Sequence, residues 1–232
     1  MMSEKNAPKI LGFAFVFVAI ASLLSGLPLE SFGIALIGVP ENLSETMLKI
    51  AESPVTLQMS LTGYLIEGSC IVLLSFLLYM VLKEENKILA SWGLGLWLIE
   101  AAFVGVRQIS IFSLLRVSLE YAKEQSAYLY SMGGIFYQSF QFTYCAQMII
   151  YAIGGIIFYG LFYKAKYIPR WLSAWGVIAA SLSLIGEIFV IFDYNVSLLV
   201  FLPILPFELV IGAWLMLKGV RKNPAEMEKE TQ

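Results

Sequence analysis

Five ionisable residues are prominent because each lies inside a long apolar stretch of the sequence. Four are carboxylic acids, Glu67, Glu100, Glu187 and Glu208, and the fifth is Arg107. A charge at the centre of a bilayer costs at least about 2.5–3.5 kcal/mol on insertion scales, so these side chains are expected to face a protein interior or water. One guanidinium cannot neutralise four carboxylates. The carboxyls that Arg107 does not neutralise should be protonated, solvated or paired with an imported cation. This is the chemistry of proton exchange or cation binding.

The depths of these residues suggest one shared cluster. Glu67, Glu100 and Glu208 each lie 12 residues into an apolar stretch, a rise of about 18 Å along a helix, which places them near the membrane midplane. Arg107 follows Glu100 by seven residues, two turns along the same helix face. Arg107 and Glu187 are expected closer to the outer surface. We therefore predict a polar centre shared by several helices.

Polar and small residues recur at helical spacing near these acids, and they add Gln147 to the candidate binding residues. Such residues let helix backbones approach closely, so the pattern by itself fits both a pore and a tightly packed bundle. The stripes are Ser60, Gly63, Tyr64, Glu67 and Cys70; Phe140, Thr143, Tyr144, Gln147, Tyr151 and Gly154; and Gly176, Ala180, Ser183 and Glu187.

The elements that would position these residues are membrane-spanning helices. Of 232 residues, 59% are hydrophobic and 14% are charged, with a mean hydropathy of +0.79, whereas soluble domains have about 25% charged residues. Crossing about 30 Å of hydrocarbon requires about 20 apolar residues. Six such runs occur, at about 10–27, 55–82, 88–115, 138–163, 172–192 and 196–217. The sequence predicts an all-α, polytopic integral membrane bundle with one domain, 1–222, and a charged, disordered tail, 223–232.

The basic residues predict the orientation. If the six runs span the membrane, eleven Lys and Arg fall on one side and three, Lys49, Arg116 and Lys123, on the other. Cytoplasmic loops carry the excess of Lys and Arg, so both termini are placed in the cytoplasm. Lys5 and Lys9 before the first run, with Ala19–Ala21 as a small-residue pattern, also resemble a signal peptide. The apolar run continues beyond that pattern, which favours an uncleaved helix.

The two longer outer connections should carry short surface helices. In the first, Asn42 or Ser44 can cap a helix that runs to about Ala51. In the second, the pair Gly133-Gly134 is expected to break the chain before the fourth span. In the last span, Pro203 and Pro206 interrupt the helix just before Glu208. Broken helices are where many transporters bind ions or substrates, although ordinary proline kinks are commoner.

Several kinds of chemistry are disfavoured by composition. The chain has no histidine, which removes Ser-His-Asp catalysis and His-ligated haem or zinc. Cys70 and Cys145 lie within apolar runs, so we expect free thiols rather than a disulfide. Neither a phosphate-binding glycine loop nor a cluster of basic and aromatic residues is present, so we expect no cofactor, no metal and no nucleic-acid partner.

The C-terminal third resembles a known family. The segments Tyr167-Ile168-Pro169-Arg170-Trp171 and Phe207-Glu208, followed by Trp214-Leu215 and Lys218-Gly219-Val220, are similar to those of the membrane family called domain of unknown function 4386. The resemblance implies a prokaryotic inner (plasma) membrane protein of about six helices and no assigned activity. It also implies that Pro169, Arg170, Trp171, Glu208, Trp214 and Gly219 are the matching positions.

Three functions fit the sequence. A proton- or cation-linked small-solute carrier or channel predicts that the acids and Arg107 line one water-accessible cavity. A scaffold or sensor predicts a dry bundle in which the same residues bond to one another. An intramembrane enzyme predicts two carboxyls within a few ångströms of each other beside a substrate-sized opening. No nucleophile accompanies the carboxyls, so an enzyme is the least favoured, and we favour a transporter in membrane lipid.

Overall fold

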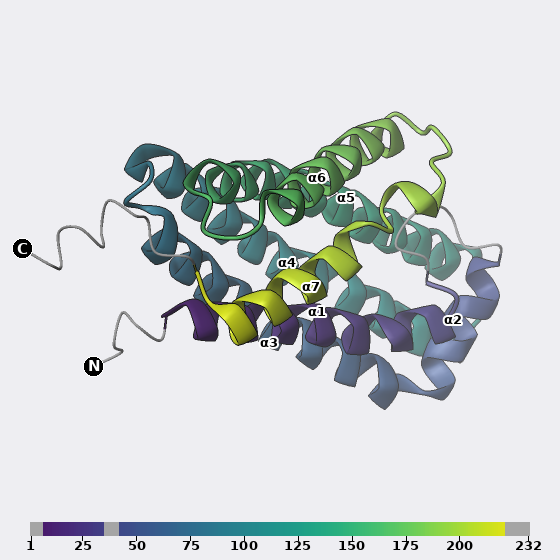
Figure 1. Ribbon diagram of the computed structural model, residues 1–232. Coiled ribbons are helices and arrows are strands. Elements are labelled where there is room, and N and C mark those ends of the chain that lie inside the picture. Colours follow the sequence, from purple (N-terminus) through teal and green to yellow (C-terminus); the bar gives the residue numbers. More distant parts are fainter. Residues whose placement is uncertain (1–6, 35–41, 221–232) are drawn as a thin grey trace, which may run out of the picture.

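A computed structural model describes residues 7–34 and 42–220, and its described part is built of helices (Figure 1). The elements are α1 (Ala7–Ser31), α2 (Leu43–Glu52), α3 (Pro54–Leu82), α4 (Lys87–Tyr121), α5 (Ala127–Ala165), α6 (Arg170–Ile191), the short 3₁₀ helix η2 (Leu198–Val200) and α7 (Ile204–Lys218). Six segments are long and apolar enough to cross a membrane, the last being Leu198–Lys218. The predicted all-α bundle of six spans is confirmed. The expected tail, 223–232, lies outside the described residues.

Local sequence signals determine where several helices begin. The side-chain oxygens of Asn42, Asn86 and Ser126 accept hydrogen bonds from the backbone N–H groups of Glu45, Leu89 and Leu129, at 3.2, 3.0 and 3.4 Å. These bonds satisfy N–H groups that have no partner in the first turn of a helix. The predicted surface helix thus begins after Asn42 rather than after Ser44.

Helix α2 is packed on the bundle rather than resting on lipid. Met47 and Ile50 are fully buried, and the hydroxyls of Ser44 and Tyr121 are 2.9 Å apart. The helix lies against α4 and α5 at the end of the bundle opposite the start of α1 and the end of α7 (Figure 1). This end is called the α2 end below, and the opposite one the terminal end.

The expected break at Gly133-Gly134 is wrong. Helix α5 begins at Ala127, not near Gln138, and continues through both glycines to Ala165. A Cβ on Gly133 would lie 2.5 Å from the sulfur of Met47. The glycine therefore provides space for α2 to dock, and the 39-residue helix, about 58 Å long, extends beyond the hydrocarbon region. Helix α4 likewise continues past the expected end at 115 to Tyr121.

The last span consists of a short α-helix preceded by a 3₁₀ helix and a turn. Helix α7 has 15 residues, about 22 Å, which is too short to cross about 30 Å of hydrocarbon. Pro203 is its N-cap. Pro206 lies in the first turn, where a missing N–H leaves no intrahelical bond unmade. The two prolines therefore determine where α7 starts, rather than kinking a continuous helix over 196–217.

The helices form a ring that is closed at one end. Around the ring α1 packs on α3, α3 on α4, α4 on α5 and α5 on α6, while α7 lies between α6 and α1. A Cβ on Gly12 would lie 2.6 Å from the carbonyl oxygen of Gly212, so α1 and α7 touch through their backbones near the terminal end. In the described part of the chain, the backbone of α1 does not approach that of α6 or η2. The ring of helices is therefore open between α1 and α6 towards the α2 end.

Candidate functional site

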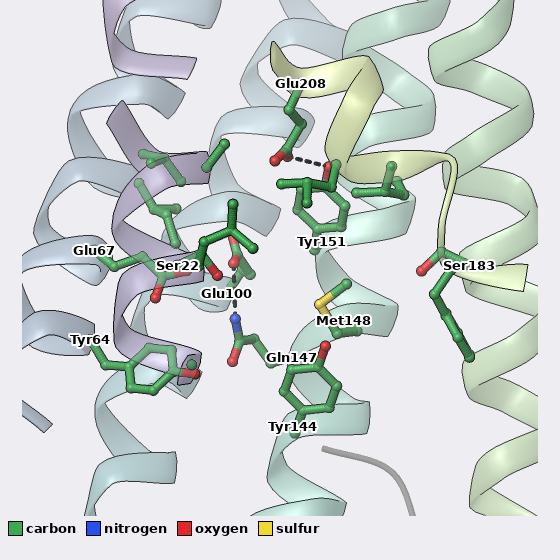
Figure 2. A pocket seen from close by; sticks show the side chains of 18 of the residues that line it. Ser22, Tyr64, Glu67, Glu100, Tyr144, Gln147, Met148, Tyr151, Ser183 and Glu208 are labelled. Atoms are coloured by element: carbon green, nitrogen blue, oxygen red, sulfur yellow. Dashed lines mark hydrogen bonds between the residues drawn. The ribbon is translucent and has the colours of Figure 1, made fainter. Parts of the chain in front are cut away.

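A cavity of about 330 Å³ lies inside this ring, within the size range of small-molecule sites. Helices α1, α3, α4, α5 and α7 supply most of its wall, and α6 contributes one residue. Its polar lining consists of Ser22, Glu30, Tyr64, Glu67, Glu100, Arg107, Tyr144, Gln147, Tyr151, Ser183 and Glu208. Figure 2 shows most of these side chains pointing towards a common centre. Five of the six predicted site residues therefore line one cavity.

Glu100 and Gln147 connect α4 to α5. The Nε2 group of Gln147 donates a hydrogen bond to Oε1 of Glu100 at 3.2 Å (Figure 2). Both side chains are buried, and the Oε1 atom of Gln147 has no partner. An amide N–H supplies no charge, so this contact holds the carboxyl in place without neutralising it.

Glu67 interacts with the first helix. The hydroxyl of Ser22 on α1 lies beside the carboxyl group of Glu67 on α3 (Figure 2). The second carboxyl oxygen, Oε2, is buried and unpartnered. Since buried polar atoms are nearly always hydrogen-bonded in folded proteins, this oxygen is available to a ligand in the cavity.

Glu208 is held by a tyrosine pair on α5. The hydroxyl of Tyr151 donates to Oε1 of Glu208 at 2.6 Å, and the hydroxyls of Tyr151 and Tyr159 are 3.3 Å apart. Tyr151 has one hydroxyl proton, so while it donates to Glu208 it can only accept from Tyr159. Glu208 is therefore the terminal acceptor of a short chain of hydroxyls.

Arg107 is a buried cation that lies between two aromatic rings. Its guanidinium carbon lies 4.3 Å from the ring centroid of Tyr64 and 5.4 Å from that of Tyr144. Among the described residues no carboxylate forms a salt bridge with it. Its Nε and Nη2 groups are buried and have no hydrogen-bond partner. Two aromatic faces therefore stabilise the charge, while two donors remain unused.

Glu187 is the predicted residue that the cavity does not include. It is fully buried on α6, its carboxyl faces the thiol of Cys145, and neither carboxyl oxygen has a hydrogen-bond partner by geometry. One turn earlier, Ser183 does line the cavity. Glu187 thus lies behind the wall rather than in it. Both cysteines are free thiols.

Several lining residues were not among the predicted site residues. Tyr64, Tyr144 and Tyr151 lie on the predicted polar stripes, but the spacing alone does not separate cavity lining from tight helix packing. Ser22 lay in the most uniformly apolar run, where the only signal was a hydroxyl at helical spacing from Ser25. Ser25 itself packs elsewhere, because its carbonyl accepts a hydrogen bond from Ser60 at 2.5 Å.

The cavity is closed towards the terminal end by aromatic rings. Trp97, at its wall, contacts Phe158 edge-on with a centroid distance of 5.2 Å. Phe207 packs edge-on against Tyr159 at 4.6 Å, and Phe15 is also buried. Towards the α2 end the lining includes exposed residues of α1, namely Leu23, Leu27 and Glu30. The exposed part of the lining therefore lies on α1 towards the α2 end.

Metal binding has no geometric support in this site. Within residues 7–34 and 42–220 no group of three or more His, Cys, Asp or Glu side chains is placed to hold an ion.

Comparison with known proteins identifies the family. The model of the family described as "Domain of unknown function (DUF4386)" matches residues 10–219, so the chain belongs to that family. The match covers all six spans almost completely. No curated protein and no solved structure matches the chain.

Proposed function

We propose that this member of the DUF4386 family is a carrier that binds a small solute in the cavity and couples its movement to a proton or cation. The observation that carries the proposal is the composition of the wall. Glu67, Glu100 and Glu208 come from three different helices and meet Arg107 in one enclosed space. Ionisable groups at membrane depth generally belong to ion or substrate pathways.

The unused polar atoms favour ligand binding over a purely structural network. In a structural network the buried donors and acceptors would be bonded to one another. Here the Nε and Nη2 groups of Arg107, Oε2 of Glu67 and Oε1 of Gln147 are all buried and unpartnered. Leaving such groups without partners costs about 1–3 kcal/mol each. A ligand that satisfies them would recover that cost, and this counts against the scaffold alternative.

The shape of the bundle favours a carrier over an open channel. The aromatic layer of Trp97, Phe158 and Phe207 separates the cavity from the terminal end. A carrier must be closed on one side while it is open on the other. The short helix α7, which places Glu208 in its second turn, resembles the discontinuous helices that form binding sites in many transporters.

No arrangement in the cavity favours an enzyme. Glu67, Glu100 and Glu208 each contact a different partner, respectively Ser22, Gln147 and Tyr151. A paired acid and base would instead be expected to face a shared opening with a nucleophile or an activated water. We therefore do not assign a reaction.

A proton-flux assay in proteoliposomes tests the proposal. Vesicles with an internal pH-sensitive dye and a clamped membrane potential would receive tetraphenylphosphonium, hexylamine or 6-aminohexanoate. We expect at least one probe to drive protein-dependent proton movement, and Arg107→Ala and Glu208→Gln to reduce it by roughly tenfold or more. Arg116→Ala, an exposed site on the same helix, serves as the control. Absence of movement with all three probes, in folded protein, would overturn the carrier.

A further inference from the structure

Two features of the cavity specify the kind of solute more closely, on the premise that the cavity is the carrier's binding site. The first is which polar atoms are free. Arg107 offers two donor nitrogens, Nε and Nη2, while Glu67 and Gln147 offer one acceptor oxygen each. The free donors belong to a cation and one of the free acceptors to an acid. The complementary ligand carries an anionic group and a separate, positively charged donor.

The free donors and acceptors lie at different depths. Tyr64, whose ring holds Arg107, lies close to Gly26 of α1, because a Cβ on Gly26 would be 3.4 Å from the tyrosine hydroxyl. Glu67 contacts Ser22, one turn further towards the terminal end. An anionic group would therefore bind nearer the α2 end, and an ammonium group about one turn deeper.

The second feature is the place where the cavity opens. Its rim on α1 consists of Leu23 and Leu27, which are 44% and 58% exposed, and both lie within the apolar part of the span. Residues at that depth face hydrocarbon, so the opening leads into lipid rather than only into water. Glu30, at the end of α1, marks the edge of this opening at the membrane surface.

The opposite rim of the opening is formed by Phe201 and by the start of α7. Phe201 packs on α6, since a Cβ on Gly186 would lie 2.8 Å from its ring. Ile204 and Leu205 at the start of α7 complete this rim. Within the described residues the backbone of α1 does not approach that of η2 or α6. The cavity therefore opens at the lining between the exposed Leu23 and Leu27 and the half-buried Phe201 and Leu205. We call this opening the lateral portal.

We propose that the solute is a zwitterionic amphiphile, with its anionic group on Arg107, its ammonium group on Glu67 and Gln147, and its apolar chain leaving through the lateral portal. The remaining wall suits such a molecule, because Val18, Ile71, Leu74 and Met148 line the cavity between the polar groups. A volume of about 330 Å³ holds a polar head group, whereas whole acyl chains remain in lipid. A membrane lipid and a free amphiphile share this chemistry.

Binding of three defined probes to the purified protein in detergent micelles tests the proposal. Dihexanoyl phosphatidylethanolamine carries the phosphate, the ammonium and the chains. Dihexanoyl phosphatidylglycerol lacks the ammonium, and phosphoethanolamine lacks the chains. We expect the first probe to bind roughly tenfold or more tightly than either of the others. Equal affinity for phosphatidylglycerol would show that the ammonium group is not recognised. Equal affinity for phosphoethanolamine would show that the apolar chains do not contribute to binding. Either result would overturn the proposal of a zwitterionic amphiphile. This comparison needs no variant.

Charge variants assign the two groups of the probe. Arg107→Gln should weaken binding of both lipids roughly 30-fold or more, because it removes the donors for phosphate. Glu67→Gln should weaken the ethanolamine lipid alone. Arg116→Gln, exposed on α4, and Glu187→Gln, buried outside the cavity, are matched controls that should bind as the wild type does. If Glu67→Gln weakened both lipids equally, the assignment of the ammonium would be wrong.

A pair of tryptophan variants tests the portal. Leu27→Trp on the rim should weaken binding of the ethanolamine lipid but not of phosphoethanolamine. Leu24→Trp is the control, since Leu24 is 63% exposed on the same helix and does not line the cavity. Unchanged lipid binding by both Leu27→Trp and Leu23→Trp would exclude this route.

Failure of this inference is distinguishable from failure of the carrier. If 6-aminohexanoate drives proton movement while neither lipid binds, the carrier is supported and the amphiphile is excluded. If the ethanolamine lipid binds but no probe moves protons, including that lipid, the site is an amphiphile-binding site without transport.

Discussion

The indole of Trp97 stacks on the ring of Tyr151, with centroids 5.5 Å apart, and its N–H donates to the backbone carbonyl of the same tyrosine at 3.0 Å. Trp97 thereby restrains both the ring and the backbone of the residue that holds Glu208. The indole also fills the space beside Gly154, where a Cβ would collide with it. One residue of α4 therefore positions a carboxyl that belongs to α7.

Removing the Tyr151 hydroxyl should lower the free energy of unfolding. Tyr151→Phe takes away the donor to Glu208, so a part-buried carboxyl loses a hydrogen bond, at a cost of about 0.5–1.5 kcal/mol. We expect a lower midpoint in detergent-induced unfolding, followed by circular dichroism. Tyr163→Phe on the exposed side of α5 is the control. An unchanged midpoint would mean that the Tyr151–Glu208 bond contributes nothing to stability.

Replacing Glu100 by glutamine should abolish proton movement while leaving the stability of the fold nearly unchanged. The amide oxygen of Glu100→Gln can still accept from Gln147, so stability should stay within about 0.5 kcal/mol of the wild type. An amide cannot release a proton, so proton movement in the vesicle assay should be lost. Glu100→Leu removes the acceptor and should also lower stability. Retained proton movement in Glu100→Gln would exclude this carboxyl from coupling.

The closest contact between α1 and α7 should tolerate no added methyl group. In Gly12→Ala the new Cβ would lie 2.6 Å from both the carbonyl oxygen of Gly212 and the backbone nitrogen of Met216. Backbone atoms cannot rotate away, so we expect a loss of about 1–3 kcal/mol in unfolding free energy. Gly160→Ala, where nothing lies within 4 Å, should instead be neutral or stabilising. Equal effects at both sites would contradict the packing described for α1 and α7.

Docking of α2 should depend on the space at Gly133. Gly133→Ala should have a small effect, since the flexible Met47 side chain can move aside, whereas Gly133→Leu should displace α2. Amide hydrogen exchange over Leu43–Glu52 would then rise in the leucine variant. The matched substitution Gly134→Leu meets only the end of Leu43, at 3.6 Å, and should leave exchange nearly unchanged. Similar exchange in the two leucine variants would argue against Gly133 as the docking site.

The spans were predictable because hydrocarbon imposes a length and a composition on every crossing segment. The residues at which the helices begin and end were less predictable. Gly133 looked like a break because glycine weakens helices in water, yet here a neighbouring helix occupies the space above it. In the structure Pro203 is the N-cap of α7, so the helix starts after it. The spacing of the two prolines in the sequence also fits a longer helix with a kink.

The polar residues of the site were predictable, but the direction in which each one faces was not. Counting from helix ends gave depth, and depth brought Glu67, Glu100 and Glu208 together correctly. Glu187 sits on a similar stripe, one turn beyond Ser183, but Ser183 lines the cavity whereas Glu187 lies beside Cys145. The absence of an acidic partner for Arg107 depends on distances between helices, which the sequence does not contain.

The contact between Gly12 and Gly212 also bears on biogenesis. It joins the first and last helices of the chain, so the wall of the cavity is incomplete until the final span has left the ribosome and entered the bilayer. Until then Arg107, Glu67 and Glu100 lie in a bundle of five spans with one side uncovered, and Glu208 is still missing from the cavity. Correct assembly must therefore keep α1 in place throughout synthesis, because its permanent neighbour on that side is the last helix to arrive.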